Sequence, residues 1–435
     1  MSLKSFFRER GYEIAVSLLL ILSIGIKFYN LHEPDSYYFD EVYYAFTIQE
    51  MAKGNMDSWE MWSKAPHGFA FEWSHPPLGK EISVVGLLIF GDNTFAWRFF
   101  QALFGGLGTL FIYILGKDLF QSKRTGVFAA FLFTFDSFIF VISRITMVDI
   151  FLVDFIILAS LFLVKYARSQ KLYFLLLSGL FCGLSMSVKW IGVYVTEFLG
   201  AVALVVLYYN ELYREPSKGG KFLDTSYRIF AVLFIAFILI PVVAYVLTYI
   251  PYFMNGHGIG DFINLQKGMF GYHQSITQTH PYQSPWWKWP LMLRTVYLYL
   301  GDYVDKHRYI YAIGNPFIWW TGCLFFILGV IQLIRKELPS LAFAVLSVFA
   351  YWLPWAFSPR KVTFLYHFLP SFIFVLLISA YFLNLIWERF EYGRSFVLFY
   401  LFVAVFMFIY FYPITAAIPI ADDTLGRYFW ISSWR

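Results

Sequence analysis

The sequence predicts an all-α membrane protein that crosses the bilayer about eleven times and forms one transmembrane domain over residues 1–435. Composition is the first observation behind this prediction, because 59% of the residues are hydrophobic and only 14% are charged. The second is the recurrence of apolar runs of about 20 residues, the length that a helix needs to cross the hydrocarbon core. No stretch is long and polar enough to form a separate soluble domain. The net charge of +5 is spread along the chain and does not favour nucleic-acid binding.

Hydropathy places the expected spans in order along the chain. A shorter apolar segment at about 81–91 is expected to lie along the membrane interface as a surface helix. The expected spans lie near residues 12–30, 94–116, 125–142, 150–165, 172–188, 192–209, 229–250, 314–334, 340–357, 363–386 and 395–413.

Basic residues predict the orientation of these spans. Lysine and arginine recur in the short connections, for example at Lys117, Lys123 and Arg124, and such residues tend to stay on the cytoplasmic side. The N-terminus is therefore expected inside the cell and the C-terminus outside. Two long loops, 31–93 and 251–312, are then expected on the extracytoplasmic face of the plasma membrane, and they contain most of the groups that could do chemistry.

Two adjacent carboxylates in the first loop, Asp40 and Glu41, are the candidate catalytic residues. Neighbouring residues on a helix point about 100° apart, so only one of the two is expected to face a substrate. The aromatic surroundings, YYFDEVYY, favour a raised carboxylate pKa and general-base chemistry. The alternative is structural, because acidic residues also suit the first turn of a surface helix.

The motif HPPLGK at 75–80 ends the stretch of the first loop, residues 37–80, in which the candidate catalytic residues lie. Pro76 and Pro77 impose an extended backbone before a helix begins, so the motif serves equally well as a turn. His75 and Lys80 stand on either side of this rigid turn, where they could converge on an anionic group.

Other charged residues lie near the outer ends of spans. Arg98 has a simple explanation as a side chain that reaches the headgroups. Arg144 and Asp149 bracket an outer turn and are expected either to pair with each other or to bind a substrate. Lys189 is expected to meet a phosphate or a carboxylate, because the positive-inside rule disfavours a cation at that end.

The second long loop contains His273, His280 and a tryptophan-rich run, WWKWP. These tryptophans fit a membrane anchor at headgroup level. The alternative is a platform for a sugar ring or a peptide, and the sequence does not separate these two roles.

Eight segments in order resemble those of the protein O-mannosyltransferases, polytopic glycosyltransferases of the GT-C class. The resemblance covers nearly the whole chain, and the ordered set is far more specific than any one motif. The segments are FDEVYY, HPPLGK, FFQALFGGLGTL, SRITMVD, SVKWIG, WWKWP, GNPFIWW and YHFLP.

This resemblance implies an inverting transfer of mannose from a polyprenyl- or dolichyl-phosphate carrier to serine or threonine hydroxyls of secreted polypeptides. In the family the first-loop acidic pair is the catalytic motif; Asp40 is then the expected base and Glu41 the residue that orients the site. The expected ligands of the donor phosphate are Arg98, Arg144, Lys189, Arg360 and Lys361, and His75, Lys80, Asp149 and His367 complete the expected substrate-binding set.

The sequence departs from the family pattern at two places. It lacks any insert large enough for the lumenal β-trefoil domain of eukaryotic members, which makes it similar to bacterial members. Tyr43 also stands where the family usually has a histidine. Both departures bear on substrate selection.

No P-loop and no D-x-D pair is present, so neither a nucleotide nor an obligatory metal ion is expected. Two other functions stay open at this stage: a lipid-phosphate-sugar transferase that acts on a lipid or glycan, and a transporter with charged residues along its path. The sequence also leaves open which sugar is transferred and whether the chain forms a dimer.

Overall fold

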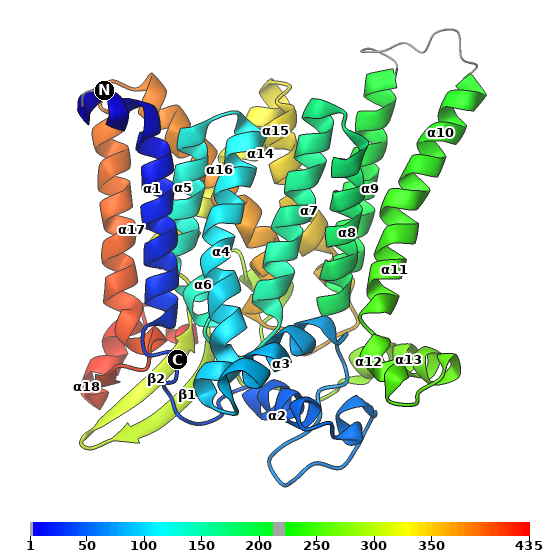
Figure 1. Ribbon diagram of the computed structural model, residues 1–435. Helices are drawn as coiled ribbons and strands as arrows, with labels where there is room; N and C mark the ends of the chain where they lie inside the picture. The colour runs from blue at the N-terminus through cyan, green and yellow to red at the C-terminus, as the bar shows by residue number, and fades with distance from the viewer. Residues whose placement is uncertain (1–2, 212–221) are drawn as a thin grey trace.

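The computed structural model describes residues 3–211 and 222–435. Within these ranges, nine helical segments are long and apolar enough to cross a membrane, and they stand side by side as a bundle (Figure 1). Eight of them are built on α1 (Leu3–Phe28), α4 (Thr94–Phe120), α7 (Asp149–Ser169), α9 (Ile191–Tyr209), α14 (Pro316–Arg335), α15 (Pro339–Trp352), α16 (Leu369–Arg389) and α17 (Gly393–Thr415).

The ninth segment is a composite of α10 (Phe222–Phe234), a π-helical turn (Ile235–Leu239) and α11 (Ile240–Leu247). A shorter apolar helix, α8 (Leu172–Val188), completes the set next to α7. The prediction of a helical polytopic membrane protein is thereby confirmed.

The expected span at 125–142 is not one helix. It is divided into α5 (Lys123–Thr134) and α6 (Ser137–Ile142), and Asp136 lies between them. The Asp136 carboxylate accepts hydrogen bonds from the backbone N–H groups of Phe138 and Ile139, at 3.1 and 2.9 Å, and from the Trp319 indole at 2.9 Å. A buried aspartate that caps a new helix ends the preceding one, which explains the break.

One end of the bundle, opposite the N-terminus, carries most of the non-spanning structure (Figure 1). We call this end the loop face. The expected surface helix at 81–91 is present there as part of α3, which lies across the bundle axis. The short helices of the loop face are α2 (Glu41–Ala52), α3 (Leu78–Phe90), α12 (Ile250–Met254), α13 (Ile259–Ser275) and α18 (Asp422–Leu425).

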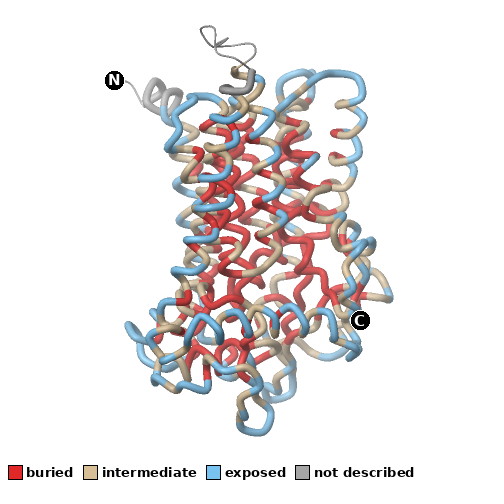
Figure 2. The backbone as a smooth tube through the Cα atoms, turned by 90° about the vertical axis from the view of Figure 1, so that its right-hand side faces the viewer, coloured by how far each residue is buried: buried red, intermediate tan, exposed pale blue. Residues whose placement is uncertain are grey.

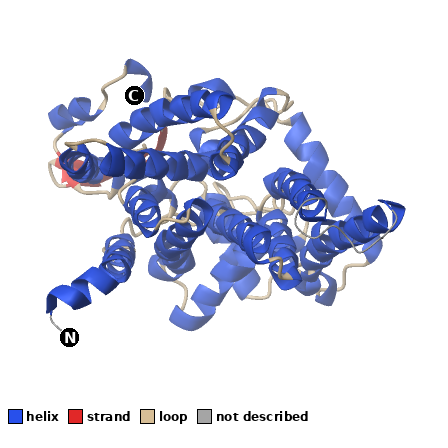
Figure 3. Ribbon diagram, turned by 90° about the horizontal axis from the view of Figure 1, so that it is seen from above, coloured by secondary structure: helices blue, strands red, loops and turns tan. Residues whose placement is uncertain are grey.

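The second long loop contains a small antiparallel sheet that the sequence analysis did not predict. Strands β1 (Val296–Tyr303) and β2 (Lys306–Ala312) form a hairpin in which Leu300 pairs with Tyr309. The short β3 (Pro419–Ile420), from the C-terminal tail, adds to β2. Alternating large residues in VYLYLGDY are typical of a strand, but they follow a loop rich in tryptophan and proline that hides this pattern. The sheet lies on the same side of the bundle as both termini (Figure 3), away from α13.

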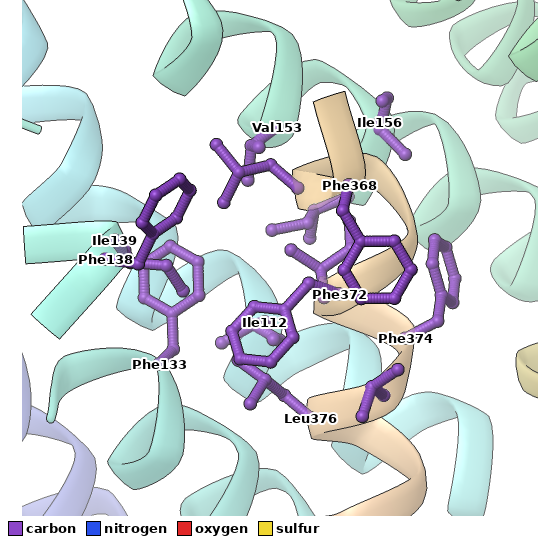
Figure 4. Packing of buried hydrophobic residues seen from close by; sticks show 14 of the residues in the cluster. Ile112, Phe133, Phe138, Ile139, Val153, Ile156, Phe368, Phe372, Phe374 and Leu376 are labelled. Carbon is purple, nitrogen blue, oxygen red and sulfur yellow. The ribbon is translucent and has the colours of Figure 1, made fainter. Parts of the chain in front are cut away.

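The buried core extends along the centre of the bundle into the loop face, while the outer helix surfaces and the loop tips are exposed (Figure 2). Helices α7 and α16 are the most buried spans. Phe133, Phe138, Ile156 and Phe372 converge from α5, α6, α7 and α16 in the centre (Figure 4). This packing holds the spans together and supports the loop face.

Candidate active site

Two adjoining cavities open at the loop face. The large cavity has a volume of about 420 Å³ and is lined mainly by loop residues, among them Asp40. The small cavity, of about 230 Å³, extends between spanning helices, where Leu152, Ile191 and Tyr194 form part of its wall. The residues that line both cavities are His75, Lys189, Arg360, Tyr366 and His367, and we call this set the junction.

Asp40 is the N-cap residue of α2, yet its side chain makes no capping hydrogen bond. The carboxylate instead lines the large cavity. Burial raises the pKa of Asp40 to about 7, and the nearby positive charges of Lys189 and Arg360 only partly oppose this effect. A carboxylate with such a pKa is suited to accept a proton near neutral pH.

Glu41 points the other way, into the protein. It is fully buried and forms a two-pronged ion pair with Arg98, in which Nε and Nη2 lie 2.8 Å from Oε1 and Oε2. It also accepts a hydrogen bond from the backbone N–H of Thr146 at 2.9 Å. Glu41 therefore ties the first loop to α4 and to the turn before α7, and Asp40 is the member of the pair that faces the cavity.

Arg98 does not face the cavities. Its remaining donors bind the backbone carbonyls of Leu31, Pro34 and Ser36, so all five N–H groups are used within the protein. The expectation that Arg98 contacts a donor phosphate is wrong for this structure, because a fully bonded and buried guanidinium offers no group to a ligand.

Arg144 and Asp149 do not pair with each other, which corrects one of the sequence-based alternatives. Arg144 donates to the carbonyls of Ile26, Lys27, Tyr29 and Asn30 at distances of 2.6–3.2 Å. It thus satisfies carbonyl groups at the C-terminal end of α1, which lack partners within the helix. Arg144 holds α1 in place and lines neither cavity.

Asp149, which lines the small cavity, pairs instead with the junction residue Lys189. The Lys189 ammonium lies 2.8 and 2.9 Å from the two carboxylate oxygens. Lys189 thus meets a carboxylate, one of its two expected partners, and it also lines both cavities.

His75 and Lys80 do converge on an anionic group, and this group is the protein's own Glu72. His75 Nδ1 lies 2.8 Å from Glu72 Oε1, and Lys80 Nζ lies 2.7 Å from Oε2. Burial by itself would raise the pKa of Glu72, but the charge of Lys80 and the hydrogen bonds from Lys80 and His75 outweigh it and hold that pKa well below its usual range. Lys80 is a buried clamp, whereas His75 lines both cavities.

Arg360 brings a guanidinium to the junction from the loop between α15 and α16. Its Nε donates to the Val362 carbonyl at 3.0 Å, and its Nη1 lies 3.3 Å from His273 Nδ1. Among the described residues Arg360 has no carboxylate in an ion pair. The adjacent Lys361 is exposed and lines neither cavity.

His273 links three loops around this arginine. Its Nε2 lies 2.9 Å from the Ser74 carbonyl, which it can reach only as a donor, so Nδ1 is the acceptor for Arg360. Burial, with the charge of Arg360, lowers the pKa of His273 to about 3. The imidazole is neutral at physiological pH and connects α13 to the first loop and to Arg360.

His367 lines the junction from the start of the α16 segment, and its Nδ1 forms a 3.0 Å hydrogen bond with the backbone of Phe364. Its ring stacks on Trp289, with centroids 5.9 Å apart. Trp289 is fully buried, so it supports the site wall rather than anchoring the protein at the headgroups. Of the tryptophan run, Trp287 is the member with more than half of its surface exposed.

Sequence reasoning missed Glu72 and gave no role to His273. Glu72 carried a usable signal, because it is a rare carboxylate three residues before the HPPLGK motif. The partner of His273 lies 87 residues away at Arg360, and no local pattern shows such a contact.

Two family profiles together match nearly the whole chain. The profile described as "Dolichyl-phosphate-mannose-protein mannosyltransferase" matches residues 17–255. A second profile, "C-terminal four TMM region of protein-O-mannosyltransferase", matches residues 258–434.

Individual proteins give the same result. The polyprenol-phosphate-mannose–protein mannosyltransferase of Mycobacterium tuberculosis is 26% identical, with 98% of this chain and 92% of that protein covered. The protein of the same name from Mycolicibacterium smegmatis is 24% identical, over 83% and 82% of the two chains.

Solved structures show the same fold. The S. cerevisiae protein O-mannosyltransferase complex bound to the sugar donor aligns with a TM-score of 0.82 at 14% identity, over 98% of this chain and 93% of that one. ArnT from Cupriavidus metallidurans bound to undecaprenyl phosphate gives a TM-score of 0.61 at 14% identity, over 96% and 78% of the chains.

Proposed function

The chain belongs to the protein O-mannosyltransferase family and is a polyprenol-phosphate-mannose–protein mannosyltransferase, and from this premise we propose that Asp40 is its general base. The small cavity holds the lipid-phosphate end of the donor, because apolar residues of spanning helices line it beside the junction cations. The large cavity receives the serine or threonine of the polypeptide acceptor. The mannose then lies at the junction.

The reaction follows from this placement. The acceptor hydroxyl oxygen attacks the anomeric carbon while the bond from that carbon to the phosphate oxygen breaks. Asp40 takes the hydroxyl proton, and the electron pair of the broken bond leaves with the lipid phosphate. Attack from the side opposite the leaving group inverts the anomeric configuration. A hydroxyl is a weak nucleophile at neutral pH, so a base at this position lowers the barrier.

Arg360 is the main counter-charge for the leaving phosphate. It lines both cavities, and its positive charge is not consumed by an ion pair among the described residues. Lys189 assists, but Asp149 already neutralises much of its charge. Fixed cations at developing negative charge are a large source of transition-state stabilisation. We accordingly expect transfer to proceed without a nucleotide and to persist in the presence of a metal chelator.

The loop face lies outside the cytoplasm in this proposal, with the protein in the plasma membrane and its acceptors among secreted polypeptides. The basic residues Lys117, Lys123, Arg124 and Lys165 lie at helix ends away from the loop face, which supports a cytoplasmic position for that end. A donor with its prenyl tail in the bilayer can present its headgroup to the small cavity from the side.

The observation that carries the proposal is the Asp40 carboxylate, which lines the large cavity without capping its helix and whose pKa is raised to about 7. The test uses purified protein in detergent, polyprenyl phosphate mannose and a Ser/Thr-rich peptide. Mass spectrometry should show one added hexose with wild type and none with Asp40→Asn. NMR of the product should show the anomeric configuration opposite to that of the donor.

A matched control is Asp302→Asn, which alters an aspartate on the exposed hairpin whose side chain is 94% accessible. This variant should transfer mannose like wild type. Turnover by Asp40→Asn close to that of the control would remove Asp40 from the role of base. A product with retained configuration would contradict the single-displacement mechanism.

A further inference from the structure

We propose that His75, held in one tautomer by Glu72, recognises a hydroxyl group of the transferred mannose by accepting a hydrogen bond at Nε2. Glu72 is the positioning residue, and His75 is a specificity-determining residue that touches the sugar. The inference rests on the proposed function, because it takes the junction of the two cavities as the place where the sugar lies.

Nδ1 of His75 carries the ring proton. Among the described residues, the hydrogen-bond partners of this ring all lie at Nδ1: Glu72 Oε1 at 2.8 Å, and the hydroxyl oxygens of Tyr44 and Ser74 at 3.2 Å each. An ionised carboxylate only accepts hydrogen bonds, so Nδ1 carries the proton and donates it to Glu72. Burial lowers the pKa of His75, so the ring is neutral and Nε2 carries a free lone pair.

Hydrogen bonds to both carboxylate oxygens keep Glu72 ionised and fix its position. Lys80 donates to the other carboxylate oxygen, Oε2, at 2.7 Å, and also to the His75 carbonyl at 3.0 Å. Ser74 Oγ donates to Glu72 Oε1 at 2.6 Å. The carboxylate is therefore held on both oxygens, and the spacing of HPPLGK brings the histidine and the lysine onto it. Hydrogen bonds of this kind fix the orientation and tautomer of a histidine.

The His75 ring lies at the place where we expect the sugar to bind. His75 lines both cavities at the junction, where its ring packs edge-on against His273 with centroids 5.1 Å apart. The phosphate occupies one side of the junction and the attacking hydroxyl the other, so the mannose ring lies between them. An unprotonated imidazole nitrogen can only accept, and the hydroxyl groups of a hexose are the donors that such a ligand presents.

The experiment compares mannosyl donors that each lack one hydroxyl, at C2, C3, C4 or C6, on a polyprenyl phosphate carrier. Transfer is measured as kcat/KM with wild type and with His75→Ala. We expect one of the four donors to be transferred by wild type about 10- to 100-fold less well than the parent donor. With His75→Ala the same donor should be transferred within about 2-fold of the parent, because the partner of that hydroxyl is gone.

Two more variants separate recognition from a structural role. His75→Gln keeps an acceptor oxygen and should restore part of the sensitivity to that one hydroxyl. Glu72→Gln places an amide next to Nδ1, which allows Nε2 to carry the proton, and should reduce the sensitivity as His75→Ala does. A variant that merely disturbed packing would slow all five donors equally and leave their ratios unchanged.

Equal ratios among the five donors in wild type and His75→Ala would overturn the proposal. This outcome differs from a failure of the proposed function, in which wild type would not transfer mannose at all or Asp40→Asn would transfer it like wild type. Glu72→Gln leaves Lys80 without its partner, so the comparison for that variant is made with protein whose gel-filtration profile matches wild type. His75→Ala alone decides the inference if Glu72→Gln does not fold.

Discussion

Two regions of the loop face use charged residues in opposite ways. In the packed region, formed by Glu41, Arg98 and Arg144, each charged group is bonded to several partners within the protein. In the cavity region, Asp40 and Arg360 face open volume, and neither is in an ion pair among the described residues. The two regions meet at the peptide bond between Asp40 and Glu41.

This difference shows how one acidic pair serves two purposes. The Glu41 pair fixes the backbone of the first loop against α4, and this anchor determines where Asp40 lies. Asp40 is then held at the wall of the large cavity, where burial raises its pKa, a cost to folding that serves the reaction. Activity should therefore depend on the cavity region and stability on the packed region.

The largest expected effect is on turnover in Asp40→Asn. Loss of the base should lower kcat by roughly 10²- to 10⁴-fold, while donor binding stays close to wild type and folding is not destabilised. Single-turnover transfer measures the rate, and the thermal unfolding temperature in detergent checks the fold. A large drop in that temperature would show that Asp40 belongs with the packed region.

The next largest effect is on stability in Glu41→Gln. The change leaves the buried Arg98 guanidinium without its counter-charge, so the free energy of unfolding should fall by about 3–5 kcal/mol. Denaturant unfolding in detergent measures it. The control is Glu388→Gln, which removes a surface partner of Arg124 at 2.9 Å and should cost at most about 1 kcal/mol. Similar losses for the two variants would erase the contrast between buried and surface pairs.

A smaller effect is expected for Arg360→Met, which removes the junction cation that has no ion-pair partner in the part of the chain that the structure describes. Hydrogen bonds to a charged group contribute about 1.5–3 kcal/mol, so kcat/KM for the donor should fall by roughly 10- to 100-fold. Lys361→Met is the matched control, since it removes the neighbouring exposed charge and should leave kcat/KM unchanged. Equal losses in both variants would point to the general electrostatic field of the loop rather than to a contact with phosphate.

The smallest and most gradual effect is that of pH. Asp40 must be ionised to act as a base, so kcat/KM should rise with pH and reach half of its plateau near pH 7. For folding the sign is opposite. Because the folded-state pKa is raised from 3.8 to about 7, the stability linked to Asp40 is full below about pH 4 and is lost as pH rises through 7.

Asp40→Asn tests this second sign directly. The variant should unfold at a higher temperature than wild type at pH 8 and lose this advantage as the pH falls towards 4. A plateau of activity that already begins at pH 5 would mean that the cavity does not raise the Asp40 pKa in the working enzyme.

Much of the architecture could be predicted from the sequence. Runs of apolar residues locate the spans, since an apolar helix of about 20 residues crosses the bilayer with its backbone hydrogen bonds satisfied. The pattern failed at Asp136, where one buried carboxylate divides an otherwise apolar segment into α5 and α6. It also failed for the sheet, because strand β3 comes from a tail more than 100 residues beyond β2.

The class of protein, the loop that holds the acidic pair and the family of reactions follow from the amino-acid sequence, because these depend on local composition and on ordered motifs. Which carboxylate faces the cavity, and which cation is left for a phosphate, depends on how the chain folds. The physical reason is that the groups within a few ångströms of a charged side chain set how much of its charge remains available to a ligand. Glu41 meets Arg98 across 57 residues, Asp149 meets Lys189 across 40, and Arg360 meets His273 across 87.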